Sequence, residues 1–190
     1  MNRRAMLRNL ALLPGAMVFY RSQHAHATVF ASPLDVNRVR PPGAAAEDQF
    51  AGRCIRCGRC VESCSYRCIH LLDIRYGLHA GTPVIAVDKL PCLLCMDCVT
   101  VCPTGALTPV SQSEVRMGTA IIDHFACAAW TELALCRTCY DVCPFKGKAI
   151  VLAELKPAVV ADACTGCGLC THACPVSREQ GEKAVNISPR

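Results

Sequence analysis

The stretch Cys92–Pro103, which reads CLLCMDCVTVCP, decides the fold that we expect of this chain. Its four cysteines follow the spacing C-x2-C-x2-C-x3-C, and a proline comes directly after the last of them. The two-residue gaps let a short loop turn around one bound group, so that three thiolates and several backbone N–H groups face it. The proline then keeps the loop from continuing as a helix. This stretch therefore predicts a compact loop that is built around an inorganic group.

The same spacing recurs along the chain, with one variation. The runs, numbered motif I to motif IV in chain order, place their cysteines at Cys54, Cys57, Cys60 and Cys64; at Cys92, Cys95, Cys98 and Cys102; at Cys127, Cys136, Cys139 and Cys143; and at Cys164, Cys167, Cys170 and Cys174. Only motif III has a long first gap. The common spacing is that of bacterial ferredoxins. We therefore expect four [4Fe–4S] clusters on sixteen of the seventeen cysteines.

The four cysteines of one motif are not expected to hold the same cluster. The first three wrap one cubane, and small residues such as Gly58, Gly166 and Gly168 allow the backbone to approach it closely. The fourth cysteine is expected to start a short helix that leads away from the loop. It therefore ligates the other cluster of a pair.

Three other uses of cysteine fit the sequence less well. Zinc uses paired C-x2-C units but gains nothing from a third and fourth cysteine at these spacings. A disulfide framework favours larger and less regular spacings. A c-type haem needs C-x2-C-H, and no cysteine of this chain precedes a histidine.

Two residues depart from the pattern of the repeat. Cys68 is an extra thiol after motif I, and it either substitutes for Cys64 or tunes the site, or else is a spare buried cysteine that acts as a small apolar residue. We favour the spare cysteine, because Cys64 already has the correct spacing. Trp130 stands in motif III where the tight spacing would place a second cysteine, and we interpret it as a lid over the cluster.

Charge and composition exclude several classes of function. The net charge is +5, but the acid-free first 27 residues carry Arg3, Arg4, Arg8 and Arg21, which leaves 16 basic against 15 acidic residues. This balance gives no argument for nucleic-acid binding. Arg53, Arg56, Arg59 and Arg67 are interpreted as a solvated face. No paired carboxylates, nucleophile–base pair or phosphate-binding loop emerges, so we expect an electron carrier with no catalytic residues.

The N-terminus resembles a twin-arginine export signal. The segment Asn2–Arg8 (NRRAMLR) precedes an apolar stretch, Leu10–Tyr20, that is too short to span a membrane, and Ala25–Ala27 reads as a cleavage site. We therefore expect residues 1–27 to direct a folded protein to the periplasm, after cluster insertion in the reducing cytoplasm. Beyond Ala27 no stretch of 18 apolar residues follows, so any membrane contact is expected to be peripheral.

The predicted fold class is α+β, with two ferredoxin-like units of short strands and helices around the clusters. Residues 28–48 are expected to form a linker or surface arm, residues 49–180 tandem ferredoxin-type domains, and residues 181–190 a tail. Short strands are predicted at Ile69–Ile74, Val84–Asp88, Thr119–Asp123, Ile150–Glu154 and Ala158–Asp162.

From about Val39 to Val176 the chain resembles the NapG/MauM-type polyferredoxins. Besides the cysteines, the similarity includes Arg40–Ala44 (RPPGA), Phe50, Ala80–Pro83 (AGTP), Arg116–Gly118 (RMG) and Asp162–Cys167 (DACTGC), together with the long first gap of motif III. The wider family looks like the electron-transfer subunits of molybdenum oxidoreductases. That likeness favours a nested pairing of motif I with motif IV and of motif II with motif III over an adjacent pairing.

The resemblance also implies partners. It predicts a periplasmic relay that takes electrons from a membrane iron–sulfur, quinol-oxidising protein and passes them to a periplasmic cytochrome or reductase. Two alternatives stay open: a maturation or electron-delivery factor for a periplasmic enzyme such as methylamine dehydrogenase, and an electron-transfer subunit of a larger oxidoreductase.

Overall fold

The computed structural model describes residues 39–177 and 182–190. The expected export signal and most of the expected linker lie outside these residues. Within them the helices are α3 (Glu47–Arg53), α4 (Arg59–Glu62), α5 (Asp97–Thr100), α6 (Thr138–Asp141) and α7 (Leu169–Ala173). The strands are β1 (Ile69–Leu71), β2 (Pro83–Ile85), β3 (Gly118–Ile122), β4 (Ile150–Ala153), β5 (Lys156–Val159) and β6 (Val185–Pro189). Short 3-10 helices occur at Ile74–His79, where two turns meet at a kink at Gly77, and at Gln112–Glu114 and Ala161–Ala163.

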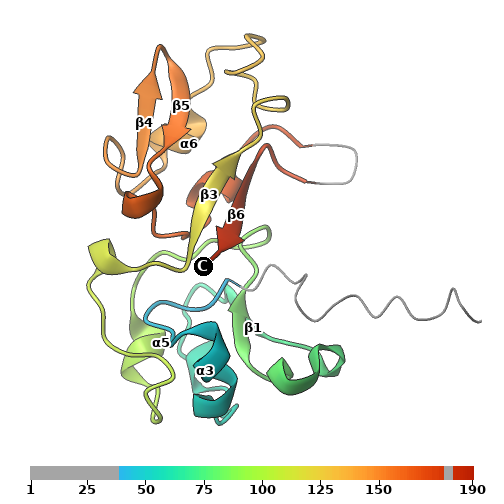
Figure 1. The fold of residues 1–190 in the computed structure, drawn as a ribbon, viewed down its shortest axis with the longest axis vertical. Helices are drawn as coiled ribbons and strands as arrows, with labels where there is room; N and C mark the ends of the chain where they lie inside the picture. The colour runs from blue at the N-terminus through green and yellow to red at the C-terminus, as the bar shows by residue number, and fades with distance from the viewer. Residues whose placement is uncertain (1–38, 178–181) are drawn as a thin grey trace, which may run out of the picture. The chain divides into compact units, whose positions relative to one another are not determined.

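The strands form antiparallel pairs, not one extended sheet. β1 pairs with β2, β3 with β6, and β4 with β5 (Figure 1). In the β3–β6 pair, Gly118 lies opposite Pro189 and Ile122 opposite Val185, so the C-terminal segment pairs with a strand from the middle of the sequence. A strand is present at each predicted place, although β1 and β2 are shorter than expected and β5 ends at Val159, with a 3-10 turn where its predicted end lay. The expectation of a plain tail at 181–190 missed β6.

Four of the helices are single turns that lie inside the cysteine motifs. Each contains the third cysteine and ends before the fourth, so the expectation that the fourth cysteine starts a helix is wrong. The fourth cysteine instead closes the helix, because its N–H bonds to the carbonyl three residues earlier, as Cys64 does to Val61 and Cys102 to Val99. Where proline follows, the next residue has no N–H with which to continue.

The segment before α3 is part of the core. Val39 and Phe50 are fully buried, and Arg40 is only 5% exposed. Arg40 donates to both carboxylate oxygens of Glu47 at 2.7 Å, and its guanidinium lies 4.5 Å from the centroid of the Phe50 ring. The described end of the expected arm is therefore buried and locked to α3.

Cysteines make up much of the interior. Ten of the 29 buried apolar residues in the described part of the chain are cysteines, and Phe50 is the sole aromatic among them. Nowhere in residues 39–177 and 182–190 is a helix both long enough and apolar enough to cross a membrane.

Candidate metal centres

The first group of cysteines joins two motifs. Cys54, Cys57 and Cys60 of motif I line one pocket together with Cys102, the fourth cysteine of motif II. We call this group site I, and we number the other sites likewise by the motif that supplies the first three thiols.

Site II is the reciprocal arrangement. Cys92, Cys95 and Cys98 of motif II line a pocket with Cys64, the fourth cysteine of motif I. Cys68 lines the same pocket, so site II contains five thiols. Motifs I and II therefore exchange their fourth cysteines.

The C-terminal motifs exchange theirs in the same way. At site IV, Cys143 of motif III joins Cys164, Cys167 and Cys170. At site III, burial and then the charges of neighbouring thiols raise the pKa of Cys139 to about 11, the neighbours being Cys127, Cys136 and Cys174. The fourth cysteine of motif IV is therefore within electrostatic reach of motif III, in agreement with the contact between α6 and α7.

This arrangement contradicts the nested pairing. Nesting requires motif IV to complete site I, whereas the structure brings Cys102 there from motif II. The reason is local: α4 contacts α5 and α6 contacts α7, so the motifs that are adjacent in sequence face one another. The long first gap of motif III does not change the pairing, because the longer loop still brings Cys136 to the same group.

The loops of motifs I, II and IV share an unusual backbone. In each, the residues on both sides of the second cysteine have positive φ: Arg56 and Gly58, Leu94 and Met96, and Gly166 and Gly168. Such a pair of left-handed residues turns the chain tightly and lets successive N–H groups converge on an anionic group. Glycine marks only some of these positions, so the sequence alone located the turn but not its conformation. In motif III the corresponding residue, Arg137, has φ −134°.

The thiols are held in surroundings that disfavour free thiolates. Burial, followed by the charge of Cys54, raises the pKa of Cys60 to about 11. Burial, followed by the charge of Cys95, raises the pKa of Cys98 to about 12. Bound metal offsets this repulsion, because its positive charge stabilises several thiolates together.

Cys102 differs from the other fourth ligands. Although burial raises its pKa, hydrogen bonds from the backbone N–H groups of Thr104 and Leu107 lower it more, and the pKa of Cys102 is below its ordinary value. The Leu107 N–H lies 3.4 Å from its sulfur. Direct N–H contacts to sulfur of this kind are also one of the determinants of a cluster's potential.

The sites differ in their exposure to solvent. Cys57 of site I and Cys95 of site II are exposed, whereas Cys164, Cys167 and Cys170 of site IV are all buried. Sites I and II therefore each present one thiol to solvent, whereas the first three thiols of site IV are shielded from water.

Trp130 packs beside site III, but its contacts are structural. Its indole N–H donates to the carbonyl of Pro157 at 3.0 Å. The ring of His124 stacks on the indole, with 3.7 Å between the ring centroids. Nothing in the sequence analysis pointed to His124 as the partner in this stack. Its position six residues before Trp130 gave no signal of it.

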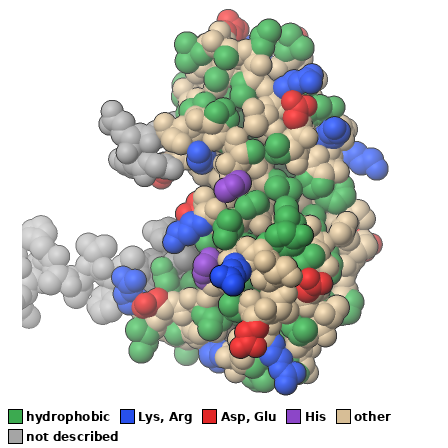
Figure 2. Space-filling model, turned by 180° about the vertical axis from the view of Figure 1, so that it is seen from behind, with side chains coloured by type: hydrophobic (Ala, Val, Ile, Leu, Met, Phe, Trp, Pro, Cys, Tyr) green, Lys and Arg blue, Asp and Glu red, His purple; other side chains and the backbone are tan. Residues whose placement is uncertain are grey.

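The arginines in and around motif I, Arg53, Arg56, Arg59 and Arg67, are exposed, in agreement with a solvated face. Two of them also hold the local backbone and α3. Arg56 donates to the carbonyls of Leu78 and Ala80, and Arg53 donates to the side chain of Gln49. On the face shown in Figure 2, basic and acidic side chains are interspersed, without a continuous field of one sign.

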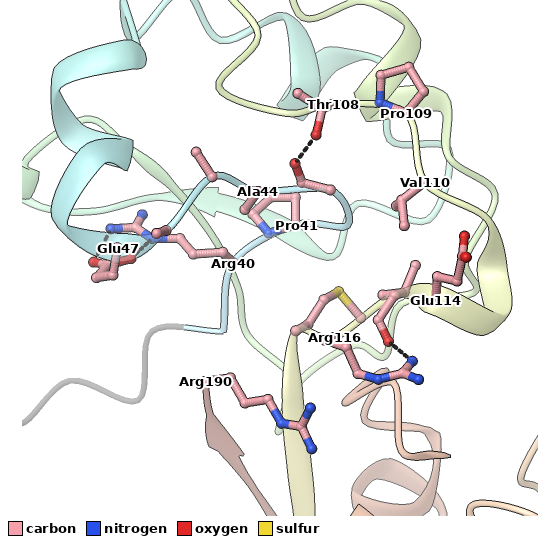
Figure 3. Close-up of a pocket in the computed structure, with 15 residues that line it drawn as sticks. Arg40, Pro41, Ala44, Glu47, Thr108, Pro109, Val110, Glu114, Arg116 and Arg190 are labelled. Carbon is pink, nitrogen blue, oxygen red and sulfur yellow. Dashed lines mark hydrogen bonds and ion pairs between the residues drawn. The ribbon is translucent and has the colours of Figure 1, made fainter. Parts of the chain in front are cut away.

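A further pocket lies elsewhere and contains no cysteine. It is bounded by Arg40 and Glu47 on one side and by Arg116 and Arg190 on the other (Figure 3). Arg40 is already paired with Glu47, and Arg190 donates to the carbonyl of Ala161. The arginines on both sides of this pocket are therefore already bonded within the protein, and the pocket is unrelated to the thiol groups.

The thiol groups fit iron–sulfur clusters by their chemistry. Sites I, II and IV each combine at least four soft sulfur donors with a mostly apolar lining. Three of the loops also have the paired left-handed residues that can direct N–H groups toward an anion. In the described residues, no three His, Cys, Asp or Glu side chains converge closely enough to hold a single metal ion.

Family models match the cysteine motifs in three consecutive pairs, I with II, II with III, and III with IV, so they do not distinguish the adjacent pairing from the nested one. Two models, each described as a 4Fe-4S dicluster domain, match this chain, one at residues 53–106 and again at 91–146, the other at residues 119–175. The first and last of these segments contain motifs I with II and motifs III with IV. No solved structure matches the chain significantly.

Curated relatives cover most of the chain. The ferredoxin-type protein NapG of Escherichia coli is 41% identical over 168 residues, which is 80% of this chain and 71% of that protein. The methylamine utilization ferredoxin-type protein MauM of Methylobacillus flagellatus is 39% identical over 80% of this chain and 68% of its own length. The ferredoxin-type protein NapF of Escherichia coli is 30% identical over 74% of this chain.

Proposed function

Because this chain belongs to the NapG and MauM family of ferredoxin-type proteins, it is an iron–sulfur electron carrier, and we propose that it relays electrons through four [4Fe–4S] clusters in the periplasm. Its donor in this proposal is a membrane quinol-oxidising protein, and its acceptor is a periplasmic cytochrome or reductase. Such a cluster accepts and releases one electron, and the chain itself supplies ligands, insulation and spacing.

The proposal assigns sixteen ligands in four sets. Site I is Cys54, Cys57, Cys60 and Cys102; site II is Cys92, Cys95, Cys98 and Cys64; site III is Cys127, Cys136, Cys139 and Cys174; site IV is Cys164, Cys167, Cys170 and Cys143. Motifs I and II then form one ferredoxin-like α+β unit, and motifs III and IV form a second.

The observation that carries the proposal is the exchange of fourth cysteines, because it holds the two clusters of each unit close together. Burial, then the charge of Cys95 and then that of Cys60 raise the pKa of Cys98, so a thiol of site I is electrostatically coupled to site II. The pKa of Cys170 in site IV is likewise raised by burial, by the thiols of its own loop and then by Cys139 of site III. Between the units, the Cys92 N–H bonds to the Cys167 carbonyl at 2.8 Å. These contacts support the electron order site I, site II, site IV, site III.

Export through the twin-arginine route is part of the proposal. It is supported by the sequence of Asn2–Arg8 and by the need to insert clusters before the thiols meet an oxidising compartment. Replacing Arg3 and Arg4 together by lysine should keep the protein in the cytoplasm with its clusters intact. If this variant still reached the periplasm, the export route would be wrong.

A second candidate function follows from the relatives themselves. MauM is named for methylamine utilization, and it is about as similar to this chain as NapG is, at 39% against 41% identity. The chain could therefore deliver electrons during the maturation or turnover of a periplasmic enzyme of that kind. In a strain without this chain, such an enzyme would be made but stay inactive, whereas a relay for respiration would leave it active.

The direct test is chemical analysis of the anaerobically purified protein. Four clusters require about sixteen iron and sixteen labile sulfide atoms per chain, and EPR during a reductive titration should show interacting cluster pairs. Reduction by quinol should then depend on added membranes. Bound zinc in place of iron, or oxidation of the cysteines to disulfides in the freshly isolated protein, would overturn the proposal.

A further inference from the structure

Site II contains one thiol more than a cluster requires. Cys64 and Cys68 line the same pocket as Cys92, Cys95 and Cys98, and of these five only Cys95 is exposed. Cys68 is 2% exposed, and its sulfur lies 3.5 Å from the sulfur of Cys64. A [4Fe–4S] cubane has four iron corners, so it takes four of these five sulfurs.

The position of Cys68 is set by the turn that follows α4. The N–H of Arg67 bonds to the carbonyl of Cys64, and Arg67 has a positive φ of 52°, which turns the chain back before β1. The turn therefore returns Cys68 to the side of Cys64, at the base of site II. The Cys68 thiol also faces the thiol of Cys92, so it contacts candidate ligands that come from two different motifs.

We propose, on the basis of the ligand sets given above, that Cys68 is an alternative fourth ligand of site II, so that either Cys64 or Cys68 can complete its cluster. Their sulfurs lie side by side in one buried pocket, and each can reach a position that the other vacates by a change of side-chain torsion. A thiol that acted only as a small apolar residue would not need to lie beside the sulfurs of Cys64 and Cys92.

Motif II provides a matched control. Cys102 is the fourth cysteine of that motif and completes site I, as Cys64 completes site II. The cysteines that line the site I pocket are Cys54, Cys57, Cys60 and Cys102 alone, without a fifth thiol. Loss of Cys102 therefore cannot be rescued from within its site, whereas loss of Cys64 can.

The experiment compares iron content and EPR spectra of four anaerobically purified proteins: wild type, Cys64→Ala, Cys102→Ala, and Cys64→Ala combined with Cys68→Ala. We expect Cys64→Ala to keep the wild-type iron content. Cys102→Ala and the double variant should each lose iron. The loss should be about one iron per chain if a three-iron cluster with its own EPR signal remains, and about four irons if the whole cluster is lost. The proposal is overturned if Cys64→Ala loses as much iron as the double variant, or if the double variant keeps all its iron.

A second comparison keeps the test decisive if Cys64→Ala does not accumulate. Cys64→Ser, with and without Cys68→Ala, retains the size of the side chain, and the same difference in iron content is expected between the two. The wild-type analysis separates the two hypotheses: an iron content far below about sixteen would contradict the four-cluster relay itself, whereas a full wild-type content with no rescue in Cys64→Ala would contradict only the role of Cys68.

Discussion

The backbone N–H of Cys92 donates a 2.8 Å hydrogen bond to the carbonyl of Cys167, which joins a cysteine of site II directly to a cysteine of site IV. Next to this contact, the chain around Val87 packs on Gly168. A Cβ atom at Gly168 would lie 2.7 Å from the Cβ of Val87, so the approach of the two loops depends on a missing side chain. The contact that links the two halves of the proposed relay therefore leaves no room for a side chain at Gly168.

Replacing Gly168 by alanine should weaken this link. The residue has a φ of 81°, so alanine there costs about 1–2 kcal/mol of backbone strain, and the clash with Val87 adds about 1–3 kcal/mol of overpacking. We expect a lower denaturant midpoint and slower electron transfer between sites II and IV, measured by flash reduction with EPR detection of the individual clusters.

Gly58→Ala is the matched control for this change. Gly58 stands at the same place in motif I and has a similar φ of 75°, but nothing lies within 4 Å of its Cβ position. It should show the backbone cost alone, with unchanged transfer between the sites. Equal effects of the two substitutions on the transfer rate would contradict the role given to the contact between Cys92 and Cys167.

Replacing Arg40 by alanine should destabilise the N-terminal half strongly. The Arg40 side chain is 6% exposed, bonds to Glu47 through two nitrogens, and also donates to the Thr82 hydroxyl and the Pro83 carbonyl. Removal of one partner of a buried pair costs about 3–5 kcal/mol. The partial exposure of Glu47 favours the lower end of that range. Anaerobic guanidinium titration, followed by the loss of cluster absorbance, measures the effect.

Arg75→Ala controls for the loss of an arginine as such. Its ion pair with Asp73 is solvent-exposed, and pairs of this kind contribute little to stability. We expect its titration curve to overlay that of the wild type. If Arg40→Ala behaved like Arg75→Ala, the buried end of the arm would not be part of the folded core.

Trp130→Phe should separate packing from electron transfer at site III. Phenylalanine keeps a ring that can stack on His124 but removes the hydrogen bond to the Pro157 carbonyl, which is worth about 0.5–1.5 kcal/mol. We expect a small loss of stability with unchanged iron content. If Trp130 were a gate in the electron path, the rate of reduction of site III would change in this variant although its iron content did not.

The sequence predicted the loops of the sites well, because cysteine spacing is a direct consequence of cluster geometry. It also predicted the first five strands, whose β-branched and apolar residues are flanked by glycine and proline. It did not predict that Leu94 and Met96 adopt positive φ as glycine does, since the turn imposes that conformation against their own preference.

Long-range relationships were harder to predict. The alternation of buried Val185 and Ile187 with exposed Asn186 and Ser188 was a signal for β6 that the sequence analysis overlooked. Its pairing with β3 brings together residues that are 65 positions apart, as in Ile121 opposite Asn186. The pairing of motifs was taken from a resemblance and was wrong, because each motif helix contacts the helix of its sequence neighbour, which the cysteine spacing within one motif does not determine.

Removal of iron should unfold the chain cooperatively. Within the described residues the interior consists to a large extent of cysteines, and a single aromatic side chain, Phe50, is buried with them. Without metal, the core loses its cross-links and is left with ten buried thiols, whose burial and mutual repulsion disfavour the charged form. Little apolar surface then remains to offset the conformational entropy of the chain. Anaerobic treatment with a strong ferrous chelator should therefore abolish protection of backbone amides in β3–β6 and β4–β5 together with cluster absorbance. Chelator already saturated with iron is the control. Persistence of amide protection after complete iron loss would show that the apolar residues suffice to hold the fold.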